Sequence, residues 1–194
     1  MGYNFRTIQP LTETEREELN RLTRHALAIP RPSSFSPGQE SKSQAAYEEA
    51  WRAVIQADPS DYQTNSVGLG VILESMGKLG MVHEAPRPAF PTLGEFGLDG
   101  HPDPEDDQLT AEQQAFLVAY EEVFSTDSGT GPIPWYKLDD DPWVITPREV
   151  KAALEVYDAT PEELRREVSS QGDWWGRFVV FLRGVPDRGG MVLG

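Results

Sequence analysis

Four short signatures of one kind divide the sequence, and they constrain its fold more than any other feature. Each is a threonine followed three residues later by Glu or Gln, a capping box in which the two side chains satisfy backbone amides at a helix start. The pairs are Thr12 with Glu15, Thr110 with Gln113, Thr146 with Glu149, and Thr160 with Glu163. The last two have proline at the first helical position, where its missing amide costs nothing. The sequence therefore predicts a helix that begins directly after each of these four threonines.

Apolar periodicity sets the length of these helices and adds others. The first is expected to run to about Ala28, and the Thr110 helix to about Phe124. Further helices are predicted near 43–57, over 65–79 and over 173–183. The segment 65–79 is apolar nearly all round, which predicts a buried helix in which Gly68, Gly70 and Gly77 admit a close neighbour.

Aromatic and β-branched runs near the C-terminus predict a small sheet. "IPWYKL" and "WVIT" are typical of strands, and the "DDDP" between them is typical of a hairpin turn. "GGMVLG" is expected to return as a third strand. The predicted fold class is α+β and mostly helical, with a helical N-terminal part and C-terminal helices packed on a two- or three-stranded antiparallel sheet.

A segment rich in proline and glycine, residues 84–108, has no sustained period, and it predicts a surface excursion or linker. The expected organisation is a helical region 1–83, this acidic connection 84–108, and an α+β domain 109–194, with a single domain as the alternative.

Negative charge is concentrated in one part of the sequence. The chain has 194 residues and a net charge of −15, and residues 99–141 contain twelve acidic residues against Lys137 alone, a net charge of −11. Such a segment repels phosphate backbones and anionic lipids. We therefore expect neither nucleic acid nor a membrane as a direct partner. The absence of cysteine excludes disulfides and thiolate chemistry.

The run Asp139, Asp140 and Asp141 is the stretch that most resembles a catalytic or metal site. In a strand only Asp139 and Asp141 would share a face, and two carboxylates fall short of the six to eight oxygens that calcium prefers. The calcium-loop pattern also fails here, because Val144 and Val150 occupy its glycine and glutamate positions. A polar turn is the favoured interpretation; a carboxylate pair for acid–base or magnesium chemistry and a partner-binding role stay open.

Other motifs give little support for chemistry. "GLGVILESMGKLG" matches neither a phosphate-binding loop nor a dinucleotide-binding fingerprint, and Ser75 lacks the leading glycine of an esterase elbow. His25, His83 and His101 do not stand at the spacing of a helical metal pair, so no metal site is predicted. Four of the five tryptophans lie in the last third of the chain, where core packing is favoured over a protein interface or a sugar platform.

The ordered series "GPIPWYKL", "WVITPREV", "WWGRFVVFL" and "GGMVLG" resembles the C-terminal part of small proteins of actinobacteria and their phages. The resemblance covers residues 131–194 and implies a compact terminal module. That group has no established activity, so the resemblance implies no functional residue. The unbroken "DDD" departs from its pattern.

These observations favour a non-enzymatic accessory protein that uses its acidic segment to bind a basic surface of another protein. No catalytic residue, metal or cofactor is predicted, and the expected location is the cytoplasm or a virion. The alternative is a carboxylate-dependent hydrolase of sugars or phosphoesters with Asp139 and Asp141 as its acids. A narrower form of the first hypothesis treats the acidic segment as a mimic of nucleic acid. The predicted binding residues are Asp103, Glu105, Asp106, Asp107, Asp139, Asp140 and Asp141.

Overall fold

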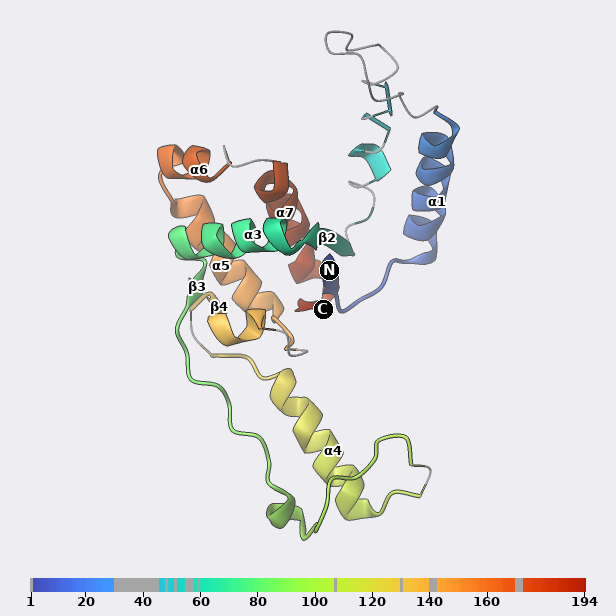
Figure 1. The fold of residues 1–194 in the computed structure, drawn as a ribbon, viewed down its shortest axis with the longest axis vertical. Coiled ribbons are helices and arrows are strands. Elements are labelled where there is room, and N and C mark those ends of the chain that lie inside the picture. Colours follow the sequence, from blue (N-terminus) through green and yellow to red (C-terminus); the bar gives the residue numbers. More distant parts are fainter. Residues whose placement is uncertain are drawn as a thin grey trace.

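The structure is a computed structural model. It describes residues 2–29, 46–47, 49–50, 52–54, 58, 60–106, 108–129, 131–139, 143–169 and 173–194. The fold is α+β and mostly helical, as the sequence predicts, with a small antiparallel sheet (Figure 1).

The antiparallel sheet brings both ends of the chain together. Strand β1 (Gly2–Thr7) lies between β2 (Asp61–Asn65) and β5 (Met191–Leu193). Phe5 is opposite Tyr62 on one side and opposite Leu193 on the other. The prediction of a strand in "GGMVLG" is confirmed. The N-terminal part contains the predicted helices α1 (Glu13–Ala28) and α3 (Ser66–Lys78), but also the strands β1 and β2, which the sequence did not predict because their pairing partners lie far away in the sequence.

Four helices pack around this sheet and form the main apolar core. They are α3 (Ser66–Lys78), α5 (Pro147–Ala159), α6 (Glu162–Ser169) and α7 (Asp173–Gly184). The ring of Phe178 on α7 lies 4.9 Å from that of Phe5 and 5.3 Å from that of Tyr62, measured between centroids. The Tyr62 hydroxyl donates to the Trp174 carbonyl over 2.9 Å, which fixes α7 to the sheet. We call β1, β2, β5 and these four helices the body.

The predicted helix 65–79 is confirmed as α3, and Gly68 shows why a glycine is needed in it. A Cβ at Gly68 would lie 2.1 Å from the Thr64 hydroxyl oxygen and 2.9 Å from the Trp174 ring. A Cβ at Gly77 would lie 3.2 Å from the Trp135 ring, whereas Gly70 faces open space, so the predicted close approach holds for Gly68 and Gly77 but not for Gly70.

The capping boxes at Thr12, Thr110 and Thr146 are confirmed at the starts of α1 (Glu13–Ala28), α4 (Ala111–Phe124) and α5. Thr160 instead ends α5, and its hydroxyl donates to the Val156 carbonyl over 2.8 Å. The predicted helix near 43–57 is described only at 46–47, 49–50 and 52–54, which are helical. Trp51 and Ile55 of its apolar stripe lie outside the described residues.

Residues 84–124 project from the body as an arm (Figure 1). After the short strand β3 (Val82–His83), the chain runs outward, forms η1 (Leu93–Phe96) and returns along α4. Among the helices and strands, α4 packs mainly against η1. The proline-rich segment is thus the outgoing half of the arm, and aromatic side chains fasten it to the helix.

A row of aromatic rings runs along the arm toward the body. The Phe96 and His101 rings lie 5.6 and 5.2 Å from Phe116, which is buried. Nearer the body, Phe90 lies 5.7 Å and Phe124 5.0 Å from the fully buried Trp143, measured between centroids. These rings form a second, smaller apolar cluster outside the main core.

The predicted hairpin of "IPWYKL" and "WVIT" is wrong. Only Ile133–Pro134 form a strand, β4, which pairs in parallel with β3, and the chain then turns into the short helix η2 (Trp135–Leu138). Three consecutive residues of η2, Tyr136, Lys137 and Leu138, are buried, whereas a strand alternates between two faces. Ile145 makes an isolated bridge to Met191 instead, so "WVIT" contacts the antiparallel sheet.

Candidate functional site

The predicted acidic residues do not form one group. Asp103, Glu105 and Asp106 are exposed in the loop at the free end of the arm (Figure 1). The Asp103 carboxylate accepts from the Glu105 amide over 3.0 Å, and the Asp106 carboxylate accepts from the Gln108 amide over 2.9 Å. Among the residues that the structure describes, none of these three carboxylates forms an ion pair with Lys or Arg. Asp107 lies outside the described residues.

Asp139 lies at the other, attached end of the arm. Its carboxylate forms an ion pair with Arg87, and both side chains are half-exposed. Asp140 and Asp141 lie outside the described residues. A helix of 14 residues rises about 21 Å, and α4 lies between the two acidic sites. The structure therefore separates Asp139 from the acids at the free end.

The polar site with the most contacts joins the arm to the body, and the sequence did not predict it. Lys137 and Glu149 are fully buried and form an ion pair, with 3.0 Å between Lys137 Nζ and Glu149 Oε2. Lys137 Nζ also donates to the carbonyls of Thr126 over 2.7 Å and Val144 over 2.8 Å. An ammonium has three N–H donors, and these three acceptors use all of them.

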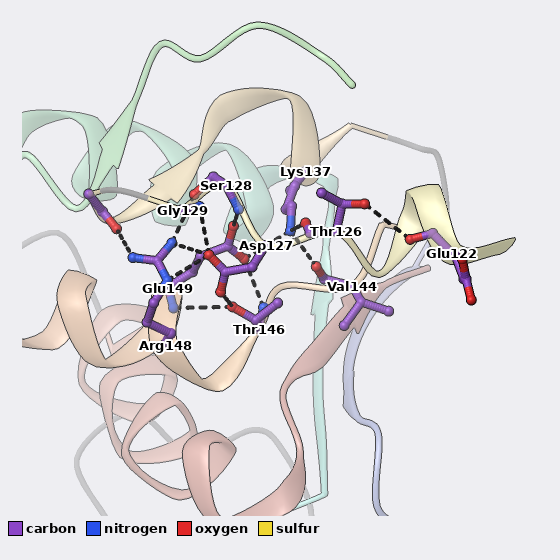
Figure 2. A network of polar contacts seen from close by, with 11 residues as sticks. Glu122, Thr126, Asp127, Ser128, Gly129, Lys137, Val144, Thr146, Arg148 and Glu149 are labelled. Atoms are coloured by element: carbon purple, nitrogen blue, oxygen red, sulfur yellow. Dashed lines mark hydrogen bonds and ion pairs between the residues drawn. The ribbon is translucent and has the colours of Figure 1, made fainter. Parts of the chain in front are cut away.

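Both carboxylate oxygens of Glu149 also accept hydrogen bonds from backbone amides. Its Oε1 accepts from the Ser128 amide over 3.0 Å, and its Oε2 accepts from the Thr146 amide over 2.8 Å (Figure 2). The second of these bonds belongs to the capping box of α5. One carboxylate therefore fixes the start of α5, the buried lysine and the segment that follows α4.

A second ion pair lies beside the first, nearer the surface. Arg148 contacts Asp127 Oδ1 through Nε at 2.6 Å and through a terminal nitrogen at 2.5 Å (Figure 2). Asp127 Oδ2 accepts from the Thr146 hydroxyl over 2.6 Å, and Oδ1 accepts from the Gly129 amide over 2.7 Å. We call Asp127, Lys137, Arg148 and Glu149 the clamp.

The electrostatics follow from these contacts. The hydrogen bond from Arg148 is the main cause that holds the pKa of Asp127 well below its ordinary value, and burial opposes it. Burial lowers the pKa of Lys137, against the hydrogen bond and charge of Glu149, which favour the ammonium form. With every donor of Lys137 occupied, the clamp is suited to holding segments in place rather than to transferring protons.

The sequence contained a partial signal for the clamp. Lys137 is the only basic residue between 99 and 141 and stands between aromatic and apolar residues, but a strand would have placed it on a solvated face. Glu149 was recognised only as the partner of Thr146 in a capping box. Its second contact, with a lysine 12 residues away, depends on the tertiary fold.

The histidines lie apart from one another. His25 is exposed near the end of α1, His83 lies partly buried beneath Gly131, and His101 belongs to the aromatic row of the arm. Within the described ranges, no group of three or more His, Asp or Glu residues is arranged to hold a metal ion.

The tryptophans take different positions. Trp175 is buried in the main core and Trp143 at the base of the arm, as the packing interpretation predicts. Trp135 is partly buried against Gly77 and Trp174 against Gly68. Trp51 lies outside the described residues.

Comparisons with protein-family models, with curated proteins and with solved structures gave no match. None of the helices in the described part of the chain is both long enough and apolar enough to cross a membrane.

Proposed function

We propose that this chain is a non-enzymatic accessory protein whose arm binds a basic surface of another protein. The observation that supports this is the exposed set of carboxylates at the arm's free end, Asp103, Glu105 and Asp106. The arm contains ten acidic residues and one arginine, a net charge of −9, out of −15 for the whole chain.

Charge complementarity sets the class of partner. A projecting segment with this charge attracts Lys- and Arg-rich surfaces and repels nucleic acid and anionic lipid. Screening acts over about 8 Å at physiological salt, so this attraction is felt mainly by groups that come close to the arm.

The test compares two variants of equal net charge. The arm variant carries Asp103→Asn, Glu105→Gln and Asp106→Asn. The control carries Glu17→Gln, Glu155→Gln and Glu163→Gln, which neutralise three exposed acids on α1, α5 and α6. Each variant removes three negative charges, so a difference between them reports where the charge lies.

Binding of a decalysine peptide is measured by calorimetry over a salt series. We expect the arm variant to lose most of the affinity, the control to lose much less, and the wild-type affinity to fall steeply with added salt. Equal losses in the two variants would reduce the proposal to an effect of net charge. Affinity that does not change with salt would contradict it.

A further inference from the structure

We propose that the clamp fixes the orientation of the arm, and that releasing it lets residues 84–124 swing on the body as a unit. This inference concerns how the arm is attached. It holds or fails independently of what the arm binds.

The position of the clamp is the first argument. The returning chain leaves α4 at Phe124, and the next residues are each held by a different group of the body or its edge. The Thr126 carbonyl accepts from Lys137, the Asp127 carboxylate pairs with Arg148, and the Ser128 amide donates to Glu149. Three consecutive residues are therefore tied to the start of α5 and to η2.

The kind of the other attachments is the second argument: among the described residues they are an exposed ion pair, ring contacts and one backbone hydrogen bond. The outgoing chain is held near the body by the half-exposed pair of Arg87 and Asp139, and exposed ion pairs contribute little. Among the described residues, the arm also meets its base through the Phe90 and Phe124 rings against Trp143, and through the Phe124 carbonyl, which accepts from the Val144 amide over 2.9 Å. Rings can slide against each other, whereas a buried ion pair with complete hydrogen bonding holds one geometry.

The interior of the arm explains why it would move as one unit. The rings of Phe96, His101, Phe116 and Tyr120 pack on one another within the arm. None of these contacts crosses to the body. Releasing the clamp leaves them intact, so the expected change is a hinge motion rather than unfolding of α4.

The test uses distances between spin labels on the full chain. Because the chain has no cysteine, Ala115→Cys on α4 and Lys151→Cys on α5, both exposed, give one label on the arm and one on the body. A second pair within the body, Glu74→Cys with Val180→Cys, reports whether the body itself stays intact.

The clamp is released by Asp127→Ala or by Lys137→Met. The matched control is Asp158→Ala, which removes an ion pair with the same 2.5 Å separation, between Asp158 and Arg183, that joins α5 to α7 within the body. We expect one narrow arm-to-body distance distribution in the wild type and in the control. In the clamp variants it should broaden to at least about twice that width, with the distribution within the body unchanged.

Two results would overturn the proposal. One is a narrow arm-to-body distribution in both clamp variants. The other is equal broadening within the body, which would mean that the clamp supports the whole fold. If Lys137→Met does not fold, the double variant Lys137→Met with Glu149→Gln decides, because it removes the buried pair without leaving a buried charge unpaired.

Discussion

The body and the arm are stabilised in different ways. The body has a hydrogen-bonded sheet that joins both chain ends. Its continuous core places Phe5, Tyr62 and Phe178 among aliphatic side chains from β5 and all four helices. In the arm's long helix only Phe116 is buried, and the rest of the packing is one row of rings. From this difference we expect local opening of the arm to cost less free energy than opening of the body.

The two regions also differ in net charge. The arm has a net charge of −9, which leaves −6 for the remaining, much longer part of the chain. Among the described residues at the base of the arm, Asp127 pairs with Arg148 and Glu149 pairs with Lys137. The arm therefore carries the higher density of negative charge, and the clamp lies at its boundary with the body.

The largest expected effect compares equal truncations in the two regions. Phe178→Ala should lower the free energy of unfolding of the body by about 3–5 kcal/mol, because it leaves a cavity in the main core. Phe116→Ala should open the arm with a smaller loss in the body. Hydrogen exchange, with amides of α3 and α4 followed separately, measures both. Equal losses at α3 in the two variants would show that arm and body unfold together.

The next effect tests the boundary between the regions. Lys137→Met should cost about 3 kcal/mol, because it leaves the Glu149 carboxylate buried without its cation. Lys151→Met, at an exposed position of α5, should stay within about 0.5 kcal/mol of the wild type. Urea unfolding gives both values. A loss below about 1 kcal/mol for Lys137→Met would show that Glu149 finds another partner or takes up a proton.

The capping boxes of α4 and α5 allow a smaller-scale comparison between the two regions. Thr110→Ala removes only a cap, so it should destabilise the arm by about 1 kcal/mol. Thr146→Ala also removes the hydrogen bond to Asp127, and about 2 kcal/mol is expected. Hydrogen exchange at α4 and α5 distinguishes the two losses. The same cost at both sites would mean that the Thr146 bond to Asp127 adds nothing.

The smallest effect concerns acid. A carboxyl whose pKa is lowered in the folded state adds stability above its unfolded value, about 4, and that stability is lost as the pH falls. The stability gap between wild type and Asp127→Asn should therefore be largest near neutral pH and shrink below about pH 4. Urea unfolding from pH 7 to pH 3 measures it.

Asp158→Asn is the matched variant in the body. The hydrogen bond from Arg183 is the main cause that lowers the pKa of Asp158. The difference in stability between wild type and Asp158→Asn should therefore shrink over the same pH range. It should be smaller throughout, because both partners are half-exposed and solvent screens them. A stability difference that grows toward acid pH for either variant would contradict a lowered pKa of that carboxyl.

Local signals explain what could be predicted. The boxes at Thr12, Thr110 and Thr146 mark helix starts correctly because each depends on hydrogen bonds between residues three apart. The Thr160 signature also precedes a helix, α6, which begins at Glu162, but its hydroxyl donates back to the Val156 carbonyl. The hairpin failed because burial of Lys137 against Glu149, not strand propensity, decides the conformation of "WYKL".

The sequence by itself determined where most helices begin, that the fold is mostly helical, and that negative charge is concentrated after residue 98. These properties depend on neighbouring residues or on composition. Only the tertiary structure decided that β1 pairs with the distant strands β2 and β5, that the acids are divided between the two ends of an arm, and that Lys137 is buried. Such contacts form between distant segments, and their free energy depends on a surrounding that does not exist until the chain has folded.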